Sequence, residues 1–209
     1  MKKVILLILS FIVFFYPLAL ANIAAVPMRY TVLYNNDIRH GEENFWSNRL
    51  EGFFEKDIYL GSKEVTAKMI PFVEQRYSID RHKRERTMAG VEFGVEPTEF
   101  LYIAEQFRYS WYSETLHRHE LVERVGMPES LIRIILSHQL VPGKEILNGY
   151  AGSEYTYDFR NGRATRVEVV AGLLAALGKG WQASVDWRHR DRIHGFDSDT
   201  FEASVSYDF

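Results

Sequence analysis

The last ten residues of the chain constrain its fold more than any other segment. Residues 200–209 read TFEASVSYDF, in which apolar and polar side chains alternate strictly. One face of an extended strand would carry Phe201, Ala203, Val205, Tyr207 and Phe209. Alternation with a period of two is typical of a strand that lies between an apolar and a polar environment. The sequence therefore predicts a two-faced strand at this end of the chain.

The three segments before it repeat the pattern. Alternation runs through residues 181–188, 166–177 and 151–159. Gly178-Lys179-Gly180 separates the first two segments, and Asn161-Gly162 separates the second from the third, and both are hairpin turn signals. The sequence predicts an antiparallel meander over this region.

Weaker alternation extends toward the N-terminus. We expect strands in residues 28–34, 46–60, 65–69, 89–96 and 100–112. Glu105 interrupts the apolar face of the last of these, and a β-bulge that turns it inward would resolve the misfit. Residues 131–140 fit either a strand or a short amphipathic helix, and the Pro142-Gly143 turn favours the strand.

The N-terminus reads as a secretory signal. Lys2 and Lys3 precede an apolar run over residues 4–16, and Ala19-Leu20-Ala21 forms a small-x-small cleavage triplet. We predict a cleaved signal peptide at residues 1–21 and a single domain at residues 22–209. An uncleaved anchor helix is the alternative, because the run is roughly long enough to cross a bilayer.

With its terminal Phe209 and with Tyr207 two residues earlier, the last strand resembles the closing strand of bacterial outer-membrane β-barrel proteins. The resemblance implies that Tyr207 and Phe209 form a signal for the barrel-assembly machinery. It also implies an all-β fold, a transmembrane antiparallel up-and-down β-barrel of about ten strands, with roughly 8 to 12 possible. The chain would then lie in the outer membrane.

The predicted connections agree with such a barrel. Turns at residues 61–63, 97, 142–143 and 178–180 would be short and periplasmic, whereas residues 36–43, 78–84, 113–129 and 191–198 would form longer external loops. Aromatic side chains gather near both strand ends, as two interfacial girdles require: Trp46, Tyr109, Trp111, Tyr157, Phe159 and Trp187 outside, and Tyr59, Trp181, Tyr207 and Phe209 inside. A soluble β-sandwich, the alternative fold, would bury these aromatic side chains in one core.

Composition excludes several functional classes. The chain has no cysteine, and therefore neither a disulfide framework nor a lipoprotein anchor. Its formal net charge of −3 gives no case for nucleic-acid binding. It contains no phosphate loop, nucleotide fingerprint or zinc-ligand spacing, so we expect neither a cofactor nor a metal site.

The face opposite the predicted lipid face carries charges of both signs. We expect a lumen-lining network of Arg76, Glu92, Arg108, Arg133, Glu154, Asp158, Arg166, Glu168, Asp186, Arg188 and Glu202. In a narrow barrel such charges must pair with one another or with water. They would either fill the barrel as a structural network or line a small pore.

No catalytic residues are predicted. Ser137 and His138 are adjacent, and neighbours on a strand point to opposite faces. His117, His119 and Glu120 would lie in the long loop, and His189 and His194 in another polar loop. A basic patch at residues 81–84, with Arg86, would be external and available to lipopolysaccharide phosphates.

The sequence thus favours a monomeric barrel that acts as a narrow channel or as a passive structural component, with outer-membrane lipid and lipopolysaccharide as its surroundings. One alternative is a surface protein whose loops at His40, Arg84, His119 and His194 bind a glycan or a protein. A lipid- or peptide-hydrolysing enzyme is the other.

Overall fold

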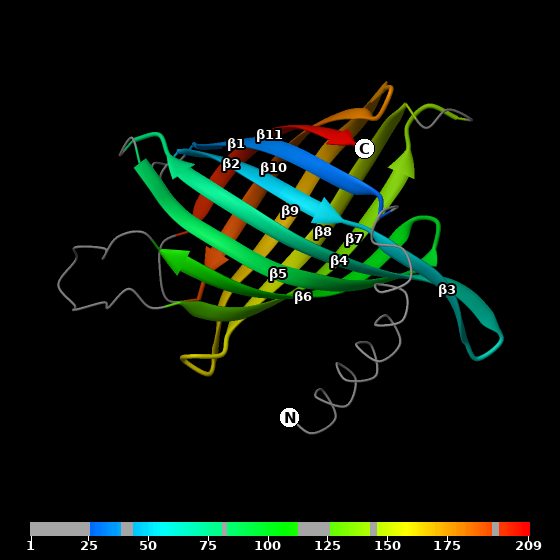
Figure 1. Ribbon diagram of the computed structural model, residues 1–209, viewed down its shortest axis with the longest axis horizontal. Helices are drawn as coiled ribbons and strands as arrows, with labels where there is room; N and C mark the ends of the chain where they lie inside the picture. The colour runs from blue at the N-terminus through cyan, green and yellow to red at the C-terminus, as the bar shows by residue number, and fades with distance from the viewer. Residues whose placement is uncertain (1–25, 39–43, 81–82, 113–125, 143–145, 194–196) are drawn as a thin grey trace.

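The computed structural model describes residues 26–38, 44–80, 83–112, 126–142, 146–193 and 197–209. All regular elements in these ranges are β-strands, joined in one antiparallel sheet (Figure 1). The strands are β1 (Met28–Asp37), β2 (Phe45–Gly52), β3 (Phe54–Leu60), β4 (Lys63–Ser78), β5 (Lys83–Thr98), β6 (Leu101–Tyr112), β7 (Met127–Gln139), β8 (Leu147–Asp158), β9 (Arg163–Gly178), β10 (Trp181–Arg192) and β11 (Ser198–Asp208).

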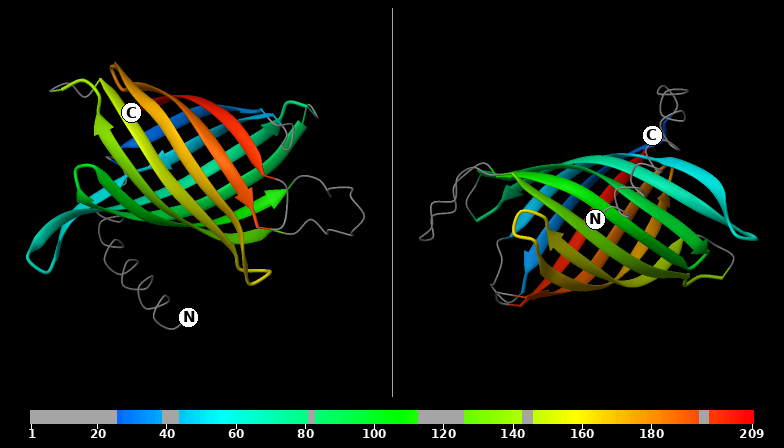
Figure 2. Two further views of the ribbon diagram at one scale, coloured as in Figure 1. Left: turned by 180° about the vertical axis from the view of Figure 1, so that it is seen from behind. Right: turned by 90° about the horizontal axis from the view of Figure 1, so that it is seen from below.

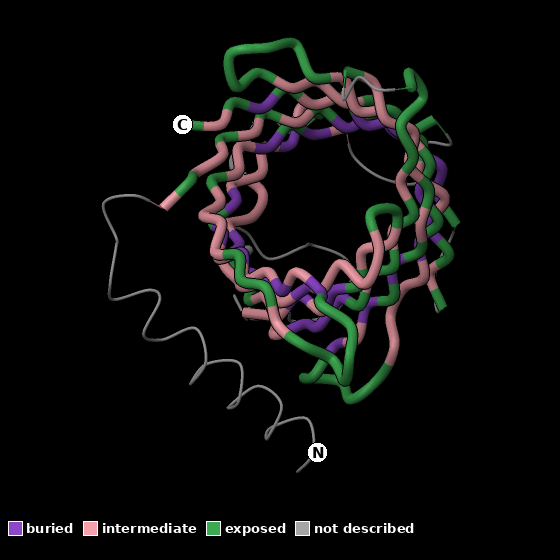
Figure 3. The backbone as a smooth tube through the Cα atoms, turned by 90° about the vertical axis from the view of Figure 1, so that its right-hand side faces the viewer, coloured by how far each residue is buried: buried purple, intermediate pink, exposed green. Residues whose placement is uncertain are grey.

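The sheet closes into a barrel. From β4 to β11 each strand pairs with the next along the chain, β11 pairs with β1, and β1 pairs with β2. Pairing of β2 with β4 completes the ring, which is visible end-on in Figure 3. Because β2 and β3 follow each other along one edge of β4, they share one place in a ten-stranded barrel. The predicted all-β, up-and-down barrel is confirmed.

The two ends of the barrel differ. β1 begins and β11 ends at the same end, where the backbones of Met28 and Phe209 exchange hydrogen bonds of 3.0 and 2.9 Å. We call this the terminal end, and the opposite one the loop end. Turns at residues 61–62, 99–100 and 179–180 lie at the terminal end together with the β7–β8 connection. β1, β4, β6, β8 and β10 end at the loop end, where β2, β5, β7, β9 and β11 begin, and Figure 2 shows both ends from two further sides.

Alternation along the strands sorts the side chains by chemistry. Large apolar side chains such as Val32, Ile134 and Leu173 are exposed on the outer surface. Buried side chains are largely polar or charged, including Glu154, Glu168 and Arg190. This arrangement inverts that of a water-soluble protein and is expected where the outside of a barrel faces lipid. Among the described residues, no helix is long and apolar enough to cross a membrane.

Residues 46–60 do not form one strand, as the alternation predicts, but two. The break is at Phe53, whose backbone N–H donates to the carbonyl of Pro27 at 2.9 Å. β1 ends its pairing with β2 at Gly52, so β3 pairs with β4 alone and the two strands project past the terminal end (Figure 1). Tyr59 lies on this projecting hairpin and is 72% exposed, outside the predicted girdle.

Two other local predictions are wrong. Glu105 is not turned inward, because β6 pairs with β7 without a bulge and keeps Glu105 on the outer face opposite Ile132. There it accepts a hydrogen bond of 2.7 Å from the Ser130 hydroxyl. Arg86 is not in an external loop, because β5 begins at Lys83 and places Arg86 directly opposite Arg76 of β4. By contrast, residues 131–139 do form a strand, as favoured.

Aromatic side chains pair near both ends of the barrel. Toward the loop end Trp46 stacks on Tyr77, with ring centroids 4.4 Å apart. Toward the terminal end Tyr207 lies 4.9 Å from Trp181 and 6.0 Å from Phe209. Aromatic rings at these positions are typical of the two membrane–water interfaces.

Candidate functional site

The interior of the barrel is organised around Arg188 of β10. Its guanidinium lies 2.8 Å from Asp186 and 2.9 Å from Glu202, and it reaches Glu154 at 3.5 Å and Glu168 at 3.6 Å. These carboxylates come from β8, β9, β10 and β11. One cation therefore compensates acids from four neighbouring strands, in a place where an unpaired charge would be costly.

Further pairs extend this cluster in both directions. Arg190 bridges Glu168 and Glu202 at 3.2 and 2.7 Å. Arg133 of β7 joins Glu154 at 3.1 Å and Glu92 of β5 at 3.2 Å. The charged network thus runs continuously from β5 to β11.

The network follows the wall of the barrel. Among the described residues, every ion pair whose two partners are given joins strands no more than two places apart in the ring. Two ion pairs pass over one intervening strand, Arg133–Glu92 and Arg188–Glu154. Each of these pairs therefore follows the wall of the barrel.

Two tyrosines are fixed against the wall by glycines. Tyr102 lies over Gly94 and donates its hydroxyl to Glu92 at 2.7 Å. A side chain at position 94 would collide with the Tyr102 ring, so the missing Cβ is what lets the ring lie flat. Tyr150 repeats the arrangement over Gly172, where its hydroxyl donates to Asp186 at 2.8 Å. Each tyrosine holds one acid of the network in place.

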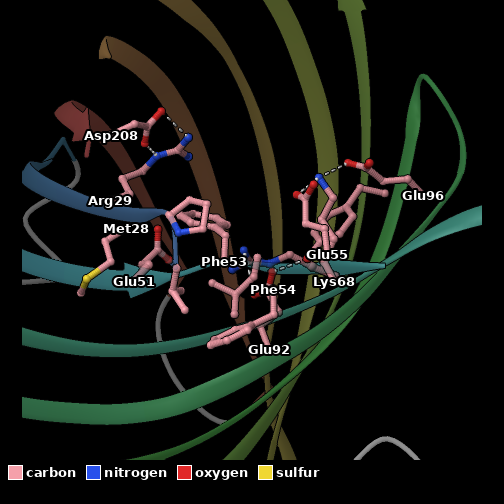
Figure 4. A pocket seen from close by; sticks show the side chains of 15 residues that line it. Met28, Arg29, Glu51, Phe53, Phe54, Glu55, Lys68, Glu92, Glu96 and Asp208 are labelled. Carbon is pink, nitrogen blue, oxygen red and sulfur yellow. Dashed lines mark hydrogen bonds and ion pairs between the residues drawn. The ribbon is translucent and has the colours of Figure 1, made fainter. Parts of the chain in front are cut away.

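The terminal end holds a cavity of about 770 Å³ (Figure 4). Arg29 contacts Asp208 there at 2.6 Å, and Lys68 lies between Glu55 at 3.0 Å and Glu96 at 2.9 Å. Its charged lining residues are Arg29, Lys68 and Arg133 against Glu51, Glu55, Glu92, Glu96 and Asp208. Acids therefore outnumber bases at this mouth. We call this space the terminal cavity.

All eleven residues of the expected charge network lie on the inward-facing alternation of their strands. Glu92, Glu154, Asp158, Glu168, Asp186 and Glu202 are buried, and Arg108, Arg133, Arg166 and Arg188 pair with carboxylates. Asp158 instead accepts hydrogen bonds from the backbone and side chain of Asn161 and so caps a turn. Arg76 lies over the ring of Phe45, 3.6 Å from its centroid. The role of these residues in transport stays a prediction.

The sequence interpretation missed several members of the site. Arg190 continues the alternation of Asp186 and Arg188, so extending that strand by two residues would have found it. Glu129, which pairs with Arg108 at 2.9 Å, fell in a predicted loop that is already strand β7. Arg29 and Asp208 meet only through barrel closure, which no local pattern reports.

Catalytic geometry is not apparent in the described part of the chain. Ser137 and His138 occupy successive positions of β7, so they point to opposite faces. His189 pairs with Asp199 at 2.9 Å, within strands β10 and β11 and not in the predicted loop. The described residues contain no group of three or more His, Cys, Asp or Glu that could hold a metal ion. His40, His117, His119, Glu120 and His194 lie outside the described residues.

No protein-family model matches the chain, and no curated protein matches it in sequence. The solved structures to which it is similar include porins and designed transmembrane β-barrels. The NanC porin matches 88% of this chain and 99% of its own, with a TM-score of 0.44 and 11% identity. The KdgM porin in complex with disordered oligogalacturonate matches 88% of this chain and 98% of its own, with a TM-score of 0.42 and 10% identity. The translocator domain of the autotransporter NalP from Neisseria meningitidis matches 93% of this chain and 92% of its own, with a TM-score of 0.38 and 10% identity.

Proposed function

We propose that this protein is a monomeric, narrow channel of the bacterial outer membrane. The observation that carries the proposal is the course of the interior network: in the described part of the chain, each ion pair whose two partners are given joins strands no more than two places apart in the ring. In a channel of this design water and small solutes pass along a surface of paired charges.

The terminal cavity supports the same proposal. Its volume of about 770 Å³ leaves room for many water molecules. The lining contains charged groups from β1, β2, β3, β4, β5, β7 and β11, so a solute entering there contacts several sides of the barrel. This cavity would form the periplasmic vestibule of the channel.

Placement in the membrane follows from the outer surface. Exposed aliphatic side chains form its middle, and aromatic pairs mark its two edges. The terminal end would face the periplasm and the loop end the exterior, with lipid and lipopolysaccharide around the barrel. Export by residues 1–21 belongs to this proposal as well, and those residues lie outside the described part.

Single-channel recording in a planar bilayer tests the proposal. Refolded mature protein that shows heat-modifiable migration on a denaturing gel should give reproducible current steps. The matched control is the same preparation after heat denaturation, which should give none. Silence from protein shown to be folded and inserted would overturn the channel and leave a structural barrel.

A further inference from the structure

At the mouth of the terminal cavity one lysine serves two carboxylates. Lys68 of β4 lies 3.0 Å from Glu55, which is directly opposite it on β3, and 2.9 Å from Glu96 of β5. Figure 4 shows the lysine between these two acids. We call Glu55, Lys68 and Glu96 the mouth triad. Because one positive charge meets two negative ones, the triad keeps a negative charge in excess with both ion pairs formed.

The other charges of the cavity do not offset this excess. Its remaining carboxylates each pair with one arginine: Asp208 with Arg29, Glu51 with Arg49, and Glu92 with Arg133. Two of these arginines are themselves shared with a further acid, Arg49 with Glu74 at 3.6 Å and Arg133 with Glu154 at 3.1 Å. With these ion pairs of the described residues counted, the lining of the terminal cavity stays negative.

The acids of the mouth triad are also more accessible than its cation. The side chains of Glu55 and Glu96 are 50% and 39% exposed, against 20% for Lys68. A solute at this end of the barrel therefore approaches carboxylate oxygens more readily than the ammonium group. In a cleft with low-dielectric walls, an excess of one charge raises the local concentration of ions of the opposite sign. Acidic side chains at a constriction favour cations in this way.

We propose that the channel prefers cations, and that the mouth triad sets this preference at the terminal cavity. The inference deepens the proposed channel function and rests on it for the passage of ions. The negative potential of the cavity itself requires only the folded barrel.

Reversal potentials in a KCl gradient across a planar bilayer test the preference. K⁺ and Cl⁻ move at nearly equal rates in water, so a potential displaced toward that of K⁺ reports selection by the protein. We expect K⁺ to be favoured by about threefold or more at low salt, and less as salt rises. Glu55→Gln leaves Lys68 with one acid and should lower the permeability ratio, whereas Lys68→Gln should raise it.

Glu99→Gln is the matched control. Glu99 is exposed in the turn between β5 and β6 at the same end of the barrel, and it does not line the cavity. Its replacement removes the same charge and should leave the permeability ratio unchanged.

An engineered thiol tests the potential of the cavity without any current. Phe54→Cys would place the only thiol of the chain in the cavity lining, beside Glu55. A methanethiosulfonate with a trimethylammonium group should modify it about threefold or more faster than one with a sulfonate group, after each rate is divided by that for free cysteine. Addition of Glu55→Gln should reduce this difference, and addition of Glu99→Gln should not.

The two measurements separate the two proposals. Current without a preference for K⁺, equal normalised thiol rates, or equal effects of Glu55→Gln and Glu99→Gln would overturn the cation preference alone. Absence of current from folded, inserted protein would refute the channel, and the thiol rates would still decide whether the cavity attracts cations.

Discussion

At the scale of single residues, Arg188 is the point on which the interior depends most. Arg188→Met would leave Asp186, Glu154, Glu168 and Glu202 close together without their shared cation. Removing one member of a buried charge network costs about 3 to 5 kcal/mol. We expect the free energy of unfolding to fall by about 3 kcal/mol, measured by urea titration of tryptophan fluorescence in micelles.

Arg163→Met is the control for this experiment, because Arg163 is exposed at the start of β9. Its unfolding midpoint should stay within experimental error of the wild type. Equal stabilities of the Arg188→Met variant and the wild type would contradict the central place given to Arg188.

The contact between Gly94 and Tyr102 makes a second prediction at this scale. Gly94→Ala would push the tyrosine ring away from the wall and break its hydrogen bond to Glu92. Overpacking of this kind costs about 1 to 3 kcal/mol. In urea unfolding we expect a loss of that size, and Gly94→Ala combined with Tyr102→Ala should lose less than the sum of the single variants.

Gly52→Ala is its matched control, since an added Cβ there would meet only ordinary contacts of 3.5 Å or more. Additive losses in the double variant would show that the ring does not depend on the glycine.

At the scale of elements, strand patterning predicted most of the barrel. Alternation reports the solvent on each face of a strand, so it located β4 to β11 and the inward side of the network. It could not predict which strands pair to close the barrel. The chain breaks at Phe53 because β1, the partner of β2, has no residues to pair beyond Gly52, whereas β4 continues and pairs with β3. Glu105 was misplaced because the pattern treats a carboxylate on an apolar face as an error, whereas Ser130 supplies it with a hydrogen bond.

The projecting part of β3 and β4 gives a prediction for an element. Closure depends on β2 pairing with β4 over Phe45 to Glu51, and not on the hairpin tip. Residues 57–66 can therefore be replaced by Asn-Gly, which joins the paired residues Lys56 and Ala67 in a tight turn. The shortened protein should keep its heat-modifiable migration on a denaturing gel.

The same excision within the barrel serves as the control. Replacing residues 127–158 by Asn-Gly removes the whole of β7 and β8 from the ring wall. This variant should not fold. Loss of folding in the first variant would assign the hairpin a role in closure.

At the scale of the whole molecule, the C-terminal strand connects folding with delivery. Phe209 and Met28 exchange backbone hydrogen bonds that do not depend on the phenylalanine ring. If Tyr207 and Phe209 are read by the assembly machinery, Phe209→Ala should lower the amount of folded protein in cellular outer membranes several-fold. Refolding of the purified variant into detergent should proceed as in the wild type, and unchanged cellular levels would contradict the assembly role.

An open lumen beside a wall-bound network is the central claim, and one engineered thiol tests it most directly. The chain has no cysteine, so Leu33→Cys on the inward face of β1 would be its only thiol. A charged, membrane-impermeant methanethiosulfonate added during single-channel recording should reduce the current of Leu33→Cys in discrete steps. It should leave the current of Val32→Cys, on the outer face, unchanged. Unreactive Leu33→Cys in folded, inserted protein would mean that the lumen is closed.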